Sequence, residues 1–365
     1  MKLADLPTPC LVLDRQKLLR NIRSMAGNLA RLQVPLRPHM KTAKSIDVAR
    51  LALSGQPGGI TVSTLAEAEY FASHGIVDIL YAVGIVPAKL DQVARLNASG
   101  ANVTVITDDP LSADAIAAHP ADIKALIEID CGEQRGGVLV AEDLISELAN
   151  RLGSNLIGVM THAGHSYQGR SVAEITQIAE LERSHVVYAA QRLRNEGHVI
   201  SVVSAGSSPT GRHAETMSGL TEFRAGVYMF GDLFQAEIET HARDSIALTV
   251  LTSVIGQPSG RLLIDAGALA LSKDRSTELT PNDFGYGLVL DIHGEPALGG
   301  AIVRKAYQEH GVVEPGPNSM IATPVGTRLR VLPNHACLTA AAHDRYHVID
   351  GLDEIVAVWP RMNGW

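Results

Sequence analysis

The sequence has few cysteines, no excess of basic charge and no long apolar run. Three cysteines, Cys10, Cys131 and Cys337, are odd in number and widely spaced, which excludes a disulfide framework and favours a reducing cytoplasmic compartment. The formal net charge of -8 argues against nucleic acid as a partner, because such binding needs a basic surface. No run reaches the ~20 apolar residues of a membrane-spanning helix, and MKLADLPTPCLVLD lacks the apolar region of a secretion signal. We therefore expect a cytoplasmic protein with no membrane partner.

The chain of 365 residues exceeds the usual size of one hydrophobic core, so two domains are expected. From about residue 34 to 232, short apolar runs alternate with segments of helical apolar spacing, several of which end at glycine. The strand candidates are VPLRPHMK, GITVST, DILYAV, NVTVITD, IKALIEID, LIGVMTHAG, VISVVSAG and FRAGVYMF. Alternating strands and helices imply parallel pairing, and eight such strands favour an α/β fold of the (β/α)8 TIM-barrel type.

The pattern changes after about residue 236. Strand-like segments follow one another with Gly, Pro and Asn turns between them: SIALTVLTSVIG, GRLLIDAG, YGLVLDIHG, RLRVLPNH, RYHVID and EIVAVWP. This pattern indicates a mainly antiparallel β domain. We place the barrel at 15–235 and the C-terminal β domain at 236–365, with the N-terminal segment 8–14 as a strand able to pair with the β domain.

In a barrel of this type the active site lies at the C-terminal ends of the strands. The polar residues at those ends are His39, Lys41, Thr64, Asp130 to Arg135, His162, His165, Ser204 to Ser208 and Tyr228. Lys41 closes the first strand, and a lysine buried there can have a lowered pKa and act as nucleophile or base. We interpret Lys44 as a solvated lysine at a loop edge.

Seven segments carry a resemblance to a known family. TPCLVLD, RPHMKTAKS, GITVSTLAEAE, THAGHSY, VSAGSSPT, FRAGVYMFGD and PNHACLT…HDRY…VWPRMNGW follow in this order from Thr8 to Trp365. Together they resemble the D-serine dehydratase and D-threonine aldolase family of fold-type III, alanine-racemase-like pyridoxal-phosphate enzymes. The resemblance implies that Lys41 is the Schiff-base lysine, which also moves protons at Cα of the substrate, and that the protein is a homodimer.

The resemblance also assigns residues to the cofactor phosphate and ring. Gly206, Ser207 and Ser208 in SAGSSPTG would cradle the phosphate with backbone N–H and hydroxyl groups, although the sequence alone fits a flexible surface turn equally well. Tyr228 would help to hold the phosphate, and Tyr167 would contact the cofactor.

Two further side chains belong to this set of candidates. His162 lies in THAGHSY, where two histidines and a tyrosine within seven residues are denser than a structural role requires, and it is a candidate acid or base. The part played by His165 stays open. Arg135, by resemblance, would lie beside the pyridine nitrogen and keep it unprotonated. Without the resemblance, an exposed loop arginine explains Arg135 equally well.

His335 and Cys337 form an H-x-C pair. In an extended segment both side chains would face the same way, and imidazole and thiolate are good ligands for Zn²⁺. Two ligands alone are a weak signal, but the pair matches the zinc pair of the family and leaves coordination places for water and a substrate hydroxyl. Dehydratases of the family tend to carry H-x-C and aldolases H-x-D. Ala43 and the segment AAAHD depart from the commoner family pattern, which leaves the substrate open.

The implied activity is a pyridoxal-phosphate- and zinc-dependent elimination of water from a β-hydroxy D-amino acid, giving a keto acid and ammonia as a D-serine dehydratase does. The alternative is an aldolase that cleaves D-threonine or 3-hydroxy-D-aspartate to glycine and an aldehyde. An amino-acid racemase needs no metal, and a non-catalytic cofactor-binding protein of this fold has no separate β domain. Both therefore fit the sequence less well.

Overall fold

The structure, a computed structural model, describes residues 1–317 and 323–365. The chain divides into two compact units. The first, here called the β unit, comprises Met1–Arg23 and Val227–Asn363; the second, the barrel unit, comprises Ser24–Gly226 and Gly364–Trp365. This division assigns residues 15–23 and 227–235, which the sequence-based bounds include in the barrel, to the β unit.

The barrel unit is built on a parallel sheet. Its strands are β2 (Leu36–Pro38), β3 (Ile60–Val62), β4 (Asp78–Gly84), β5 (Asn102–Thr107), β6 (Ala125–Asp130), β8 (Leu156–Thr161), β9 (Val202–Ala205) and β10 (Glu222–Ala225). They lie in the order β2-β10-β9-β8-β6-β5-β4-β3, and the short β7 (Val138–Leu139) pairs with β6 off this path. A parallel bridge between His39 and Thr61 links the two ends of the path. The sheet therefore nearly closes, which confirms the predicted barrel.

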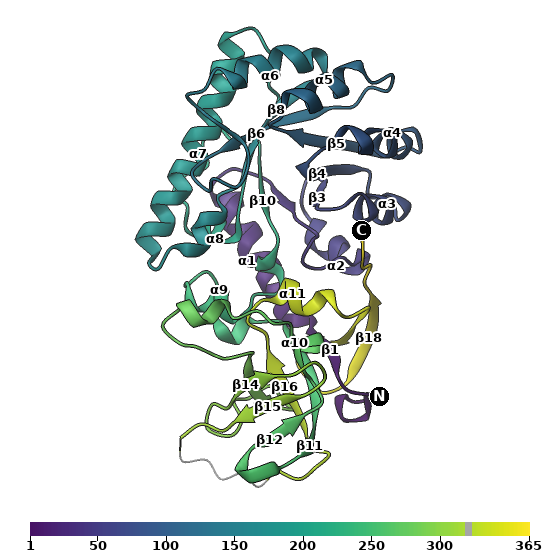
Figure 1. The fold of residues 1–365 in the computed structure, drawn as a ribbon, viewed down its shortest axis with the longest axis vertical. Coiled ribbons are helices and arrows are strands. Elements are labelled where there is room, and N and C mark those ends of the chain that lie inside the picture. The colour runs from purple at the N-terminus through teal and green to yellow at the C-terminus, as the bar shows by residue number, and fades with distance from the viewer. Residues whose placement is uncertain (318–322) are drawn as a thin grey trace. The chain divides into compact units, whose positions relative to one another are not determined.

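Helices connect the barrel strands, and Figure 1 shows α3 to α7 outside the sheet. Their bounds are α2 (Ile46–Leu53), α3 (Leu65–Ser73), α4 (Leu90–Ala98), α5 (Pro110–Ala118), α6 (Leu144–Leu152), α7 (Val172–Asn195) and α8 (Ser208–His213), with 3₁₀ turns η2 (Pro87–Lys89), η3 (Gly153–Asn155) and η4 (Gly164–Gln168). α1 (Arg15–Arg31) begins in the β unit and ends in the barrel unit.

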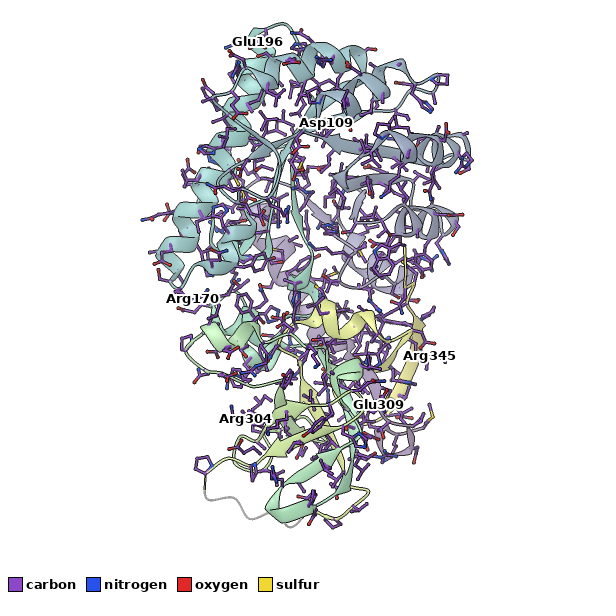
Figure 2. All side chains as sticks on the ribbon, viewed as in Figure 1. Asp109, Arg170, Glu196, Arg304, Glu309 and Arg345 are labelled. Carbon is purple, nitrogen blue, oxygen red and sulfur yellow. The ribbon has the colours of Figure 1, made fainter. Side chains whose placement is uncertain are left out.

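Capping residues start these helices where the sequence changes from strand to helix. Asp109 accepts a hydrogen bond from the N–H of Ser112 at 2.7 Å and begins α5, and Figure 2 labels this side chain. Ser171 begins α7 in the same way, with the N–H of Glu174 as donor. A side-chain acceptor at this position satisfies an N–H group that has no carbonyl partner in the helix.

Part of the barrel core is an apolar cluster. Leu80, Ile106, Leu126 and Met160, one each from β4, β5, β6 and β8, pack into one buried cluster. Burial of such a side chain stabilises the fold by about 1.5–3 kcal/mol, so the sheet can hold its strand ends in fixed positions. Polar side chains at those ends are then available for binding.

The β unit is built on a second sheet, which is mainly antiparallel. Its strands are β1 (Cys10–Asp14), β11 (Leu248–Gly256), β12 (Leu262–Ile264), β13 (Leu288–Asp291), β14 (Ile302–Ala306), β15 (Gly311–Glu314), β16 (Arg328–Leu332), β17 (Arg345–Ile349) and β18 (Ile355–Pro360). They lie in the order β12-β15-β14-β13-β16-β11-β1-β17-β18, with β12 also paired to β11. The hairpin of β14 and β15 was not among the strand candidates. β1 pairs antiparallel with β11 and parallel with β17.

Short helices lie between the strands of the β unit. They are α9 (Leu233–Glu237), α10 (Ala268–Leu271) and α11 (Ala336–Ala341), with 3₁₀ turns η1 (Leu3–Asp5), η5 (Val227–Met229), η6 (Arg243–Ser245), η7 (Pro258–Gly260) and η8 (Ser276–Leu279). Within residues 1–317 and 323–365, no helix is both long enough and apolar enough to cross a membrane.

Candidate active site

Lys41 lies in the turn that follows β2, at the C-terminal end of the strand. Its neighbours Met40 and Thr42 are fully buried, whereas the Lys41 side chain is exposed. The N–H of Met40 donates to the carbonyl oxygen of Thr61 at 2.8 Å, which ties the turn to β3. The structure thus fixes the backbone and leaves the amine accessible. The premise that Lys41 is buried was wrong, because the turn carries its side chain out of the core.

Lys44 is not the solvated lysine that the sequence suggested. Its Nζ lies 3.1 Å from Oε1 of Glu67, a carboxylate with no exposed side-chain surface, and the Lys44 side chain is 17% exposed. Oε2 of Glu67 accepts from the N–H of Ser63 at 3.1 Å. The ion pair therefore anchors the end of the Lys41 turn to the start of α3.

His162 follows β8 and has one defined tautomer. Its Nδ1 lies 2.5 Å from the carbonyl oxygen of Gly206, and because a carbonyl can only accept, Nδ1 must carry the proton. Burial and the positive charge of Lys41 lower the pKa of His162 to about 3. The imidazole is therefore neutral near pH 7, with Nε2 unprotonated, so it can accept a proton or a hydrogen bond but not donate from Nε2.

The turn from Gly206 to Ser208 connects β9 to α8. Gly206 has φ +152, and a Cβ atom here would meet the carbonyl oxygen of Arg224, so a side chain does not fit. Ser207 caps α8: its Oγ accepts from the N–H of Thr210 at 3.3 Å. The N–H groups of Ser207 and Ser208 precede the first carbonyl that α8 can offer, which makes them suitable donors for an anion.

The 3₁₀ turn η4 carries Tyr167 and His165 beside this turn. Oγ of Ser166, a buried residue of η4, lies 2.9 Å from Oγ of Ser207. Tyr167 is half-buried, and its carbonyl oxygen accepts from Arg170 at 3.0 Å. The structure therefore brings the η4 segment against the turn of Ser207.

Arg135 and Arg224 differ sharply in their surroundings. The side chain of Arg135 is 58% exposed and pairs with Glu133 at 3.4 Å, although its charge also helps to lower the pKa of His162. Arg224 is 3% exposed and donates to Ser204 Oγ and to the carbonyl oxygen of Thr161. Sequence analysis missed Arg224, because an arginine inside FRAG gives no sign that it points into the barrel.

The H-x-C pair of the β unit lies at the start of a helix, not in an extended segment. His335 is the extended residue before α11, and Cys337 lies in its first turn. The expectation that the segment is extended was therefore wrong. Cys337 nonetheless lies close enough to His335 to help raise the pKa of the imidazole, because a residue before a helix and one in its first turn can face the same way.

Two acidic residues that sequence analysis missed hold this pair. Asp232, which is 1% exposed, caps α9 and accepts from the N–H of Ala336, between the pair, at 3.0 Å. Oδ2 of Asp274 lies 3.5 Å from Nδ1 of His335. Burial lowers the pKa of His335, but Asp274 and Cys337 outweigh burial and raise it to about 11. The surroundings of His335 thus favour the protonated, positively charged imidazole.

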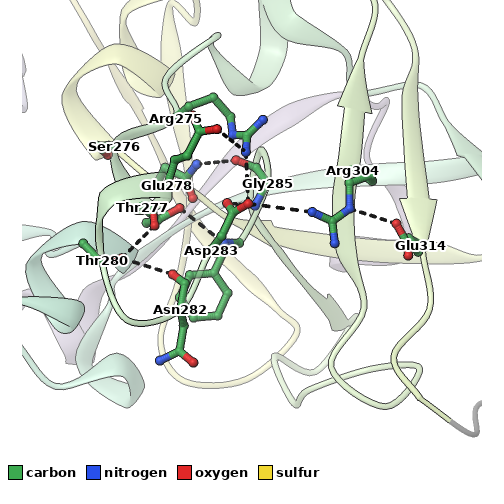
Figure 3. A network of polar contacts seen from close by, with 12 residues as sticks. Arg275, Ser276, Thr277, Glu278, Thr280, Asn282, Asp283, Gly285, Arg304 and Glu314 are labelled. Atoms are coloured by element: carbon green, nitrogen blue, oxygen red, sulfur yellow. Dashed lines mark hydrogen bonds and ion pairs between the residues drawn. The ribbon is translucent and has the colours of Figure 1, made fainter.

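A polar network supports the loop that follows Asp274, as Figure 3 shows. Arg275 pairs with Asp283 at 3.0 Å, and the side-chain amide of Asn334 donates to the carbonyl oxygens of Gly285 at 2.7 Å and Asp274 at 3.1 Å. Asn334 immediately precedes His335, so this network holds both the imidazole and its carboxylate partner.

Tyr228 does not end a strand. β10 ends at Ala225, and Tyr228 lies in η5, within the β unit. It is 3% exposed, and burial raises the pKa of its hydroxyl.

Within residues 1–317 and 323–365, no group of three or more His, Cys, Asp or Glu side chains is arranged to hold a metal ion.

Comparison with known proteins agrees with this architecture. Residues 13–233 match the family "Alanine racemase, N-terminal domain", and residues 247–349 match "Putative serine dehydratase domain". D-threo-3-hydroxyaspartate dehydratase of Delftia sp. (strain HT23) is 41% identical, with 100% of this chain and 99% of that protein covered. D-threonine aldolase of Arthrobacter sp. is 30% identical, with 96% of this chain and 92% of that protein covered.

A solved structure agrees as well. D-threo-3-hydroxyaspartate dehydratase from Delftia sp. HT23 matches with a TM-score of 0.96 and 40% identity over 100% of each chain. A cysteine-to-alanine variant of D-threo-3-hydroxyaspartate dehydratase, in the metal-free form, matches equally well. The resemblance read from the sequence is confirmed. The chain belongs to the D-serine dehydratase and D-threonine aldolase family of fold-type III pyridoxal-phosphate-dependent lyases.

Proposed function

We propose that the protein eliminates water from a β-hydroxy D-amino acid, with 3-hydroxy-D-aspartate as the first substrate to test and D-serine as the second. The observation that carries the proposal is the neighbouring imidazole and thiol of His335 and Cys337, since the aldolases of the family tend to carry aspartate at the position of Cys337. The products would be a keto acid and ammonia.

The barrel unit fits pyridoxal phosphate. Lys41 offers an exposed amine on a fixed turn, while Gly206 lets the following N–H groups of Ser207 and Ser208 approach a phosphate. When bound, the cofactor would withdraw electrons from the substrate Cα and make its proton acidic. Lys41 would hold the cofactor and then remove this proton. We propose Tyr167, Arg135 and Tyr228 as further cofactor contacts, as the resemblance implies.

His162 would serve the same proton transfer as a hydrogen-bond acceptor. Its Nδ1 proton is committed to Gly206, and its lowered pKa keeps Nε2 free of a proton. His162 would therefore accept a hydrogen bond at Nε2 during turnover. An initial role as general acid does not fit this tautomer.

The donor set of the β unit fits Zn²⁺. A thiol and an imidazole are preferred zinc ligands, and the carboxylates of Asp274 and Asp232 beside them add negative charge that attracts a cation. His335 and Cys337 would hold the ion, which would supply Lewis acidity toward the β-hydroxyl as it leaves. Asp274 faces Nδ1, so His335 would bind through Nε2.

Product analysis tests the proposal. The holoenzyme is incubated with 3-hydroxy-D-aspartate, D-serine and D-threonine, with and without a chelator. Keto acid and ammonia in equal amounts, lost with the chelator, support the dehydratase. Glycine and an aldehyde would instead identify the aldolase, the second candidate, which the match to the Arthrobacter enzyme favours.

We further propose a homodimer in the reducing cytoplasm. All three cysteines lie in the described part of the chain and are free thiols, as expected of a reducing compartment. Light scattering coupled to gel filtration gives the oligomeric state, and a monomer would overturn this proposal.

A further inference from the structure

One acidic residue lies on the buried face of α7. Residues of this face recur at helical spacing as Ile175, Ala179, Glu182, Val186, Ala189, Ala190 and Leu193. All are apolar except Glu182, which is 1% exposed. A buried carboxylate is costly unless it accepts hydrogen bonds, so its partners should indicate its role.

The partners of Glu182 belong to two different site loops. Oε1 accepts from the N–H of Ala163 at 2.8 Å and from the N–H of Gly206 at 3.0 Å. Oε2 accepts from the hydroxyl of Thr210 at 2.6 Å. One carboxylate thus joins the loop after β8, which carries His162, to the turn after β9.

Gly206 connects Glu182 to His162. Its N–H donates to Glu182 and its carbonyl oxygen accepts from Nδ1 of His162. A Cβ atom at Gly206 would collide with the backbone of Arg224, so the two backbones are packed closely and only glycine fits here. The carboxylate fixes the residue whose carbonyl selects the tautomer of His162.

Thr210 extends the link into the proposed phosphate turn. Its hydroxyl proton is used on Glu182, so in the 2.9 Å contact between Ser207 and Thr210 the Ser207 hydroxyl donates. Because the Ser207 hydroxyl proton is used on Thr210, Ser207 must accept in its 2.9 Å contact with the hydroxyl of Ser166, which donates. The hydroxyl of Ser207 is therefore directed toward Thr210, which fixes the start of the turn.

We propose that Glu182 is a positioning residue that sets the tautomer of His162 through Gly206 and orders the phosphate turn through Thr210. The proposal rests on the proposed function for the roles of His162 and the turn. Its own readouts need no turnover. If the protein fails to dehydrate any substrate, the tautomer and the affinity for pyridoxal phosphate still test Glu182.

The test compares Glu182→Leu with Glu182→Gln. Nitrogen NMR of ¹⁵N-histidine-labelled protein without cofactor reports the tautomer, with the His162 signal assigned by its loss in His162→Asn. Leucine removes every acceptor, so we expect mixed tautomers and about tenfold or more weaker binding of pyridoxal phosphate. Glutamine keeps an oxygen for both N–H groups, so it should retain the Nδ1 tautomer. Its amide donates to Thr210, whose proton then turns to Ser207, so the loss of affinity should be smaller than in the leucine variant.

Matched variants complete the test. Glu180→Gln removes an exposed acidic residue of the same helix, paired with Arg183, and should change neither readout. If Glu182→Leu does not fold, Glu182→Asp replaces it, since a carboxylate one methylene shorter cannot reach both loops and should also give mixed tautomers. A folded Glu182→Leu or Glu182→Asp protein with wild-type tautomer and affinity overturns the proposal, and so does a glutamine variant that behaves like leucine.

Discussion

Nδ1 of His162 lies 2.5 Å from the carbonyl oxygen of Gly206, so the imidazole is held as a single neutral tautomer. The low pKa of His162, about 3, has a consequence for stability. Below about pH 6.5 His162 is protonated in the unfolded chain but stays neutral in the folded protein. The unfolded state then binds more protons, and stability falls as the pH falls through this window, by at most about 1.4 kcal/mol per pH unit.

We therefore expect His162→Asn to be less acid-sensitive than the wild type. Asparagine can still donate to Gly206 but does not titrate. Urea unfolding at several pH values between about 7 and 5 measures the difference, and His39, whose pKa is also lowered, contributes to both proteins. Parallel stability curves would contradict the assigned protonation state.

Lys41→Ala should abolish turnover and the visible absorbance of the bound cofactor, because no other amine stands on the turn after β2 in a comparable exposed position. Borohydride reduction of the holoenzyme followed by peptide mapping should find the cofactor on Lys41. Lys44 is held by Glu67, so Lys44→Arg, which removes the primary amine but keeps the ion pair, serves as a control that keeps the attachment. A label on Lys44 would refute the assignment.

Ser208→Ala should weaken cofactor affinity more than it slows catalysis, by roughly ten- to hundredfold if its hydroxyl bonds the phosphate. Ser207→Ala should weaken affinity less, through disorder of the turn, because its hydroxyl donates to Thr210. Ser207 also caps α8, so its variant should lose about 1 kcal/mol of stability as well. Cofactor titration and thermal unfolding separate the two effects. Ser201→Ala, at the opposite end of β9, is the control, and unchanged affinity in both variants removes this turn from the site.

Stripping the metal should abolish elimination while cofactor binding persists, and Cys337→Ala should reproduce that loss. Cys10→Ala, which removes a buried thiol of the same unit, should keep both metal and activity. Cys337→Asp retains an anionic ligand and should raise the share of glycine and aldehyde among the products. Full activity in protein shown to be metal-free by elemental analysis would refute the role of His335 and Cys337.

Asp274→Asn should weaken metal binding about 10- to 100-fold, because it removes the charge that faces Nδ1 of His335. Competition with a zinc-binding dye measures this affinity without any substrate. Asp283→Asn acts on the same loop network but not on His335, and it should leave the affinity near wild type. Equal losses in the two variants would mean that Asp274 merely supports the loop.

The sequence determined the order of the barrel strands, the mainly antiparallel β domain and the positions of Lys41, His162 and the H-x-C pair along the chain. Apolar periodicity and helix caps are local, so they can be read without coordinates. The sequence analysis missed the hairpin of β14 and β15, because the exposed Arg304 and Lys305 of β14 stand next to each other and hide the strand pattern.

Tertiary structure decided which polar side chains meet. Glu182 lies on a helix, and Gly206 and Thr210 lie more than twenty residues later in the chain, yet they share one set of hydrogen bonds. Asp274 reaches His335 across a gap in the sequence that is more than twice as long. Lys44 is held in an ion pair with the buried Glu67, whereas Arg135 remains exposed. Burial and pairing depend on what packs against a residue, and periodicity along the chain carries no record of those partners.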